Sequence, residues 1–198
     1  MNSKYSIRAI ALGLSLAIAA GAAPAFAGMS GGMGSMGRQH TVMVGGAAMY
    51  PSRNIIQNAV HSKDHTTLVA AVKAAGLVKT LEGPGPFTVF APTNEAFDAL
   101  PAGTVQTLLK PENKAELTKI LTYHVVPGRF DAKALDARIM AGGGEAKLKT
   151  VEGGSLVVKG SGTHLSVTDD KGDTAEVTIP DVYQSNGVIL VINKVLMP

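Results

Sequence analysis

Apolar residues occupy nearly every position of the segment 67–75 and recur at helical spacing further along the chain. A helix with so little polar surface is usually buried. Thr66 or Asp64 can cap its N-terminus, and Gly76 suits its C-terminal end. The pattern therefore predicts a buried helix over 67–75, preceded by a shorter helix over 54–60.

A further helical pattern opens near Pro111, since proline is tolerated in the first turn of a helix. Four side chains at the spacing i, i+3, i+4, i+7 would share its buried face: Leu117, Ile120, Leu121 and His124. Because His124 falls on this apolar face, we expect it to be buried and bonded to a backbone group or to a residue near Thr93 or Asn94.

Strand-like segments dominate the last third of the chain. A first strand is predicted over 87–91, after a turn formed by glycine and proline. Short alternating segments separated by turns then predict an antiparallel meander over 147–151, 155–159, 163–168 and 175–179. The strongly apolar segment 188–196 reads as a central strand. Helices that precede strands indicate an α+β fold rather than alternating βαβ units.

The N-terminus has the pattern of a secretory signal peptide. Lys4 and Arg8 precede an apolar stretch over 9–23, and Ala25-Phe26-Ala27 predicts cleavage after Ala27. A membrane anchor is the alternative, but the apolar run is shorter than the roughly 20 residues that a spanning helix needs. We therefore expect residues 1–27 to be a cleaved leader and the protein to be periplasmic or secreted.

Residues 28–48 are rich in glycine and methionine and are predicted to be a flexible tail, with the folded domain over 49–198. Matches to G-x-G-x-x-G and G-x-S-x-G lie in this tail without the strand and helix that those motifs require. Thioether and imidazole groups suit Cu(I), so the tail offers one alternative function, periplasmic copper binding through Met29, Met33, Met36 and His40.

Composition narrows the remaining chemistry. The chain has 18 basic and 15 acidic residues, with Lys4 and Arg8 in the leader, and it shows no basic run, which argues against a nucleic-acid partner. The absence of cysteine excludes disulfides and thiolate sites. His61 and His65 lack the glutamate of a zinc motif and are predicted to be surface residues beside a turn. We expect no cofactor.

Three segments resemble the signatures of fasciclin domains, in that family's order and at about its spacing. They are Thr88 to Phe97, Leu121 to Gly128 and Asn186 to Pro198. The resemblance covers the chain from about residue 50 to its end. It implies an α+β fold in which an antiparallel β-sandwich or wedge carries packed helices. It also implies an adhesion or interaction role without catalysis.

The resemblance also implies candidate residues. Tyr123 and His124 correspond to the family's tyrosine–histidine pair, and Asp181, Val182 and Tyr183 to its Asp-containing segment. We expect Asp181 and Tyr183 to be exposed contacts of the predicted loop. A second set would keep the fold: Thr93, Asn94, Phe97, Asn186 and Gly187, together with the tyrosine–histidine pair.

The expected partner is a surface or matrix protein or a polysaccharide, bound by a monomer. Association with a membrane surface stays open, although no segment after the leader is apolar enough to span a bilayer. A hydrolase is a third hypothesis, but no catalytic set can be assembled from the sequence.

Overall fold

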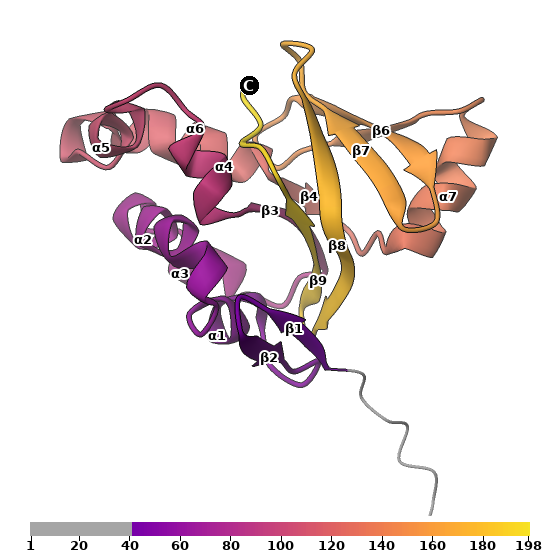
Figure 1. Ribbon diagram of the computed structural model, residues 1–198, viewed down its shortest axis with the longest axis horizontal. Helices are drawn as coiled ribbons and strands as arrows, with labels where there is room; N and C mark the ends of the chain where they lie inside the picture. The colour runs from indigo at the N-terminus through magenta and orange to yellow at the C-terminus, as the bar shows by residue number, and fades with distance from the viewer. Residues whose placement is uncertain (1–40) are drawn as a thin grey trace, which may run out of the picture. The chain divides into compact units, whose positions relative to one another are not determined.

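The computed structural model describes residues 41–198 (Figure 1). Its α-helices are α1 (Ile55–Ala59), α2 (Thr66–Ala75), α3 (Val78–Leu81), α4 (Asn94–Asp98), α5 (Thr104–Leu108), α6 (Lys114–Tyr123) and α7 (Ala132–Ala141). Two 3₁₀ turns lead into α2 and α6, namely η1 (Lys63–His65) and η2 (Pro111–Asn113). The predicted helices over 54–60 and 67–75 and the one opening near Pro111 are thus confirmed.

A small hairpin precedes the helices. It consists of β1 (Val42–Val44) and β2 (Ala47–Met49) and buries Val44 and Met49 against the domain. The prediction that residues 28–48 are wholly tail and that the fold begins at 49 is therefore wrong at its boundary. Each strand of the hairpin has only three residues, all apolar, on either side of a glycine pair. Such a short hairpin is stable here because it packs against the helices.

The main sheet has seven strands in the order β4-β3-β9-β8-β7-β6-β5. They are β3 (Phe87–Pro92), β4 (Val125–Pro127), β5 (Ala146–Lys149), β6 (Ser155–Ser161), β7 (His164–Thr168), β8 (Thr174–Gln184) and β9 (Gly187–Ile192). The predicted meander is confirmed for β5 to β8. However, β3 and β9 pair in parallel. The fold is α+β with helices packed on a sheet, as predicted, and the one difference is that the sheet is mixed and not purely antiparallel, because β3 and β9 are parallel.

The sheet curls until its two edge strands meet. The amide of Val151, just beyond β5, donates to the Val125 carbonyl of β4 at 2.7 Å. This contact protects strand edges that would otherwise expose unpaired backbone groups. β9 lies between β3 and β8 and has a core on each face, so every one of its residues is buried.

Alternate residues of the central strands serve two separate cores. Val89 and Ile189 face the helices α1 to α6, whereas Phe90 and Leu190 face α7 and the strands β5 to β8. Figure 1 shows these two layers on opposite sides of β3 and β9. We call them the helix-cluster core and the α7 core. The period of two along a strand produces this division.

Candidate functional site

Asp181 lies within β8, where the register with β9 shifts between Ile179 and Val182. Its φ of 57° makes it the one non-glycine residue with positive φ among residues 41–198. Such a conformation is uncommon outside glycine and is often tied to function. The carboxylate accepts a hydrogen bond of 2.7 Å from the amide of Ala132, the first residue of α7. Asp181 therefore fixes the start of that helix.

Tyr183 follows on the same strand and reaches the same helix terminus. Its hydroxyl donates to the Asp131 carboxylate at 3.1 Å, while Asp131 caps α7 by accepting from the Ala134 amide at 2.8 Å. The exposed Arg129 donates to the carbonyl of Gln184 at 3.2 Å. β8 and the α7 N-terminus thus share a network of side chains at the surface.

We call this region the α7 surface and define it as Arg129, Phe130, Asp131, Asp181 and Tyr183. Burial raises the pKa of Asp181, and the neighbouring Asp131 and Asp136 add to that effect. Burial, with the hydrogen bond to Asp131, also raises the pKa of Tyr183 to about 12. Both shifts disfavour the ionised form of the side chain, because burial removes it from water.

The exposure expected for the Asp-containing segment is only partly present. Asp181 and Tyr183 are half-buried, and both are held by hydrogen bonds instead of projecting from a loop. Val182 is 1% exposed and belongs to the helix-cluster core, so it has no surface for a partner. The prediction failed because Pro180 suggested a loop, whereas the segment continues β8 as an irregular strand.

Tyr123 is completely buried in the α7 core, which places it away from any partner. Its hydroxyl donates to the Ser155 carbonyl at 2.8 Å and accepts from the Asp170 amide at 2.9 Å. Burial raises its pKa to about 12. Tyr123 thereby ties α6 to the start of β6 and to the loop between β7 and β8.

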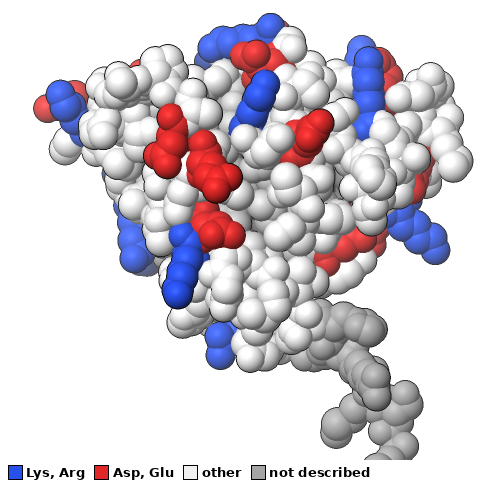
Figure 2. All heavy atoms as spheres, viewed as in Figure 1, with Lys and Arg blue, Asp and Glu red and all other residues white. Residues whose placement is uncertain are grey.

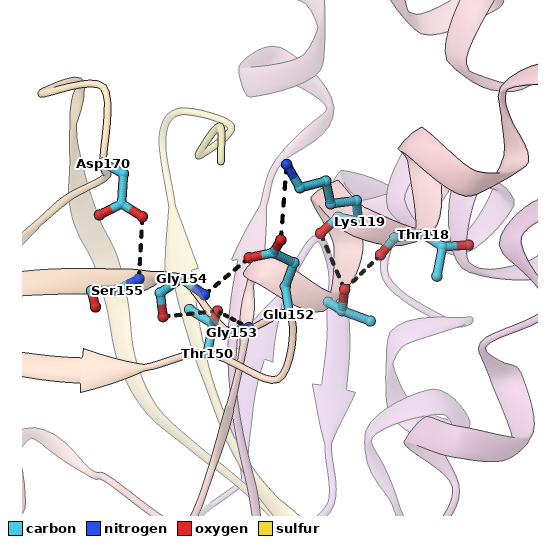
Figure 3. A network of polar contacts seen from close by, with 9 residues as sticks. Thr118, Lys119, Thr150, Glu152, Gly153, Gly154, Ser155 and Asp170 are labelled. Atoms are coloured by element: carbon cyan, nitrogen blue, oxygen red, sulfur yellow. Dashed lines mark hydrogen bonds and ion pairs between the residues drawn. The ribbon is translucent and has the colours of Figure 1, made fainter.

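A polar network joins the loop between β5 and β6 to α6 (Figure 3). Glu152 accepts from the Gly154 amide at 3.0 Å and lies 3.9 Å from the Lys119 ammonium of α6. Asp170 accepts from the Ser155 amide at 3.2 Å. A Cβ at Gly154 would come within 2.7 Å of the Tyr123 ring, so this loop can close over the ring only with glycine there.

His124 is 2% exposed, buried as its place on the helix predicted. Nδ1 lies 2.8 Å from the Ile120 carbonyl, and Nε2 accepts from the Leu196 amide at 3.0 Å. This pair of bonds requires the neutral ring with its proton on Nδ1. Burial lowers the pKa to about 4. The partners are backbone groups, and no bond joins the ring to Thr93 or Asn94, so that alternative is wrong.

Thr93 and Asn94 organise two helix starts. Thr93 caps α4 by accepting from the Ala96 amide at 3.3 Å. Asn94 accepts from the Thr67 amide at 3.0 Å and donates to the Lys63 carbonyl at 2.7 Å. Asn94 is thus the cap of α2, in place of the local caps Thr66 or Asp64 that the sequence suggested.

Phe97 is buried beside these caps in the helix-cluster core. Asn186 accepts from the Ile55 amide of α1 at 3.0 Å and donates to the carbonyls of Leu81 and Gly83 at 2.7 and 2.9 Å. A Cβ at Gly187 would collide with the Phe87 carbonyl. Each of the residues expected to keep the fold therefore caps a helix, packs in a core, bonds a backbone group or allows a close backbone approach.

Sequence reasoning missed several buried polar side chains, among them Asn58 and His65. Asn58, on α1, hydrogen-bonds with Tyr50 and with the side chain of Gln184, although nothing in its local pattern marked it. His65 is 3% exposed, so its prediction as a surface residue is wrong. Its place one position before a nearly apolar helix was the signal that could have indicated burial.

Metal chemistry finds little support within residues 41–198. In that range no group of three His, Asp or Glu side chains is placed to hold a metal ion. The same part of the chain contains no helix long and apolar enough to cross a bilayer. The predicted leader and the candidate copper ligands Met29, Met33, Met36 and His40 lie outside the described residues.

Comparison with known proteins decides the family. The model of the fasciclin domain matches residues 63–198. The chain belongs to the fasciclin family. This confirms the resemblance drawn from the three signature segments, which all fall within the matched range or its edges.

Two relatives show how the fasciclin domain is distributed. The chain is 46% identical over 161 residues to protein sll1483 of Synechocystis, covering 81% of this chain and 82% of that protein. It is 38% identical over 165 residues to transforming growth factor-beta-induced protein ig-h3 of Sus scrofa, covering 82% of this chain but 22% of ig-h3. The unit seen here therefore occurs both as most of a protein and as a part of a longer one.

The fold is shared with a solved domain pair from the insect cell adhesion molecule Fasciclin I. The TM-score is 0.68 at 18% identity, over 75% of this chain and 52% of that one. At this identity the likeness establishes the fold of the fasciclin domain.

Proposed function

We propose that this fasciclin protein is an exported adhesion or interaction module without catalytic activity, which binds a surface protein or matrix polysaccharide through the α7 surface. The observation that carries the proposal is Asp181, a half-buried residue at positive φ whose carboxylate is bonded to the start of α7 close to Tyr183. Adhesion appears in the name of the insect protein with the same fold, and a cell-surface location in that of mycobacterial MPB83, 38% identical over 122 residues.

The composition of the α7 surface supports binding. Tyrosine, phenylalanine and arginine are enriched in protein interfaces, and here Arg138 stacks on the Phe130 ring at 4.4 Å. The side chains are already ordered by bonds to α7 and β8, so little conformational entropy would be lost on binding. A nucleic-acid partner would need a continuous basic surface. On the face shown in Figure 2, the Lys and Arg side chains are spread apart and form no such surface.

The test is binding of the protein to cell-envelope and extracellular-matrix fractions, compared with the variant Asp181→Asn. Asparagine tolerates positive φ and can still accept from the Ala132 amide, so the variant removes charge while keeping the cap. We expect binding to fall about tenfold, as for loss of one charged interface contact. Asp98→Asn, an exposed change on α4, should bind normally. Equal binding by Asp181→Asn and wild type would refute a role for this carboxylate.

A further inference from the structure

The β1–β2 hairpin and the neighbouring helix α1 expose apolar side chains to solvent (Figure 1). Met43 lies on the face of the hairpin turned away from the buried Val44 and Met49, and it is 59% exposed. Tyr50, directly after β2, is 41% exposed, and Val60, at the C-terminal end of α1, is 44% exposed. Three of the five large hydrophobic side chains exposed within residues 41–198 thus belong to this part of the chain.

Polar side chains adjoin these apolar ones. The guanidinium carbon of Arg53 lies 4.8 Å from the centroid of the Tyr50 ring. Arg53 also lines an open hollow of about 360 Å³ at the surface of α1, together with Gln57, Val60 and His61. We call this region the hairpin face and define it as Met43, Tyr50, Arg53, Gln57, Val60 and His61.

The charge of this part of the chain has one sign. The sequence contains no aspartate or glutamate before Asp64, whereas Arg38, Arg53 and Lys63 follow the predicted leader. The amide of Lys63 donates to the Gly45 carbonyl at 3.1 Å, so the turn of the hairpin adjoins this lysine. Two ion pairs form within residues 41–198, and neither includes Arg53 or Lys63. Both cations are therefore available to an anionic partner.

Exposed apolar side chains next to cations match the surface of an anionic lipid bilayer. Proteins that lie on a bilayer place apolar side chains at the boundary between headgroups and acyl chains, while Lys and Arg contact anionic headgroups. Tyrosine is enriched at that boundary, because its ring is apolar and its hydroxyl is polar. A soluble polyanion would use the cations but leave Met43 and Val60 in water, so the combination favours a bilayer.

We propose that the hairpin face docks this protein on the surface of an anionic phospholipid bilayer, with Met43, Tyr50 and Val60 at the headgroup boundary and Arg53 on a lipid phosphate. The chain that precedes β1 joins the domain at this hairpin, and its nearest charged residue, Arg38, is also basic. The inference does not rest on the proposed function, because the hairpin face and the α7 surface have no residue in common.

A fluorescent reporter tests the contact directly. The chain contains no tryptophan, so Tyr50→Trp gives the full chain a single indole on the hairpin face. We expect its emission to shift to the blue on vesicles of equal parts phosphatidylglycerol and phosphatidylcholine, because the indole leaves water. Val151→Trp, at an exposed position just beyond β5, should show no shift. Because residues 1–27 are present in both variants, their own binding cannot produce this difference.

Co-sedimentation with the same vesicles measures the contributions of charge and apolar contact. Arg53→Gln should weaken binding about fivefold, as for one basic residue near an anionic membrane surface. Lys147→Gln removes the same charge at an exposed position of β5 and should bind as wild type does. Met43→Ser should also weaken binding about fivefold through lost apolar burial, whereas Met140→Ser, on the exposed side of α7, should not.

Three results would overturn the proposal. One is an unshifted emission of Tyr50→Trp on anionic vesicles, whether or not the protein sediments with them. Another is equal weakening by Arg53→Gln and Lys147→Gln, which would leave only an effect of net charge. The third is binding to soluble polygalacturonate that competes with the vesicles and is insensitive to Met43→Ser, which would identify an acidic polysaccharide as the occupant instead of a bilayer.

Discussion

On the α7 side of the sheet, large side chains such as Leu156, Leu190 and Tyr123 are completely buried, and the buried hydroxyl of Tyr123 has two partners. On the helix-cluster side, two cavities remain and His65 leaves one nitrogen without a partner. On the α7 side, the curled strands β5 to β8 enclose the core side chains. On the helix-cluster side, short separate helices cover the sheet, and their side chains do not fill all the space between them.

The helix-cluster side compensates by using polar side chains from the sheet and its loops. Asn94 and Asn186 satisfy amides at the first turns of α2 and α1, positions that have no partner within their own helix. On the α7 side Asp181 does the same for the Ala132 amide, but the helix-cluster side needs such contacts at two helices and also leaves two cavities. The predictions below test that difference.

Matched truncations should give the largest difference between the two cores. Leu190→Ala, in the α7 core, should lower the free energy of unfolding by about 3–5 kcal/mol, near the upper end for buried leucine. Leu68→Ala should cost about 2–3 kcal/mol, because a side chain that lines cavities has fewer contacts to lose. Denaturant unfolding measures both values. Equal losses, or a larger loss for Leu68→Ala, would contradict the difference in packing.

Acid should destabilise the protein through His124. The unfolded ring binds its proton near pH 6.5 and the folded ring near pH 4, so the unfolded state binds more protons between these values. The stability is therefore full above pH 6.5 and lost as the pH falls toward 4. The shift corresponds to roughly 3 kcal/mol, measured as the fall in unfolding free energy across that window.

His124→Gln separates this contribution from other titrating groups. It should be less stable than wild type at pH 7 but lose less stability on acidification, while His164→Gln, an exposed control, keeps the wild-type profile. His65 retains a dependence of the same sign, because its pKa is also lowered. An unchanged acid profile in His124→Gln would show that this ring does not carry the effect.

Removal of the Asn186 amide should be the next largest effect. Asn186→Ala leaves the Ile55 amide and two carbonyls without their side-chain partner and should cost about 2 kcal/mol. Asn193→Ala removes a single bond, to the Glu176 amide, and should cost at most about 1 kcal/mol. Similar losses in the two variants would argue against a special role of amide contacts on the helix-cluster side.

The same contrast explains what the sequence could predict. Local periodicity was enough for α2, α6 and the strands β5 to β8, because each pattern repeats within a few residues. The parallel pairing of β3 with β9 joins segments about 100 residues apart, and no local pattern records it. The β1–β2 hairpin escaped notice because each of its strands has only three residues.

The candidate site was predicted in part for related reasons. Burial of His124 followed from its place on an apolar helix face, but its bond to the Leu196 amide depends on where the C-terminal segment returns. Asp181 was expected in a loop because proline precedes it. The segment can remain part of β8 because the register with β9 shifts between Ile179 and Val182. That shift depends on the pairing of two strands and cannot be read from the local sequence.

The two N-terminal caps provide the smallest contrast. Asp131 caps α7 with a bond of 2.8 Å and also accepts from Tyr183, so Asp131→Ala should cost about 1–2 kcal/mol. Thr93 caps the shorter helix α4 with a longer bond of 3.3 Å, so Thr93→Ala should cost about 0.5–1 kcal/mol. Thermal unfolding of both variants measures the difference. A larger loss of stability in Thr93→Ala than in Asp131→Ala would contradict this order. It would mean that the cap of α4 contributes more to stability than the length of its hydrogen bond indicates.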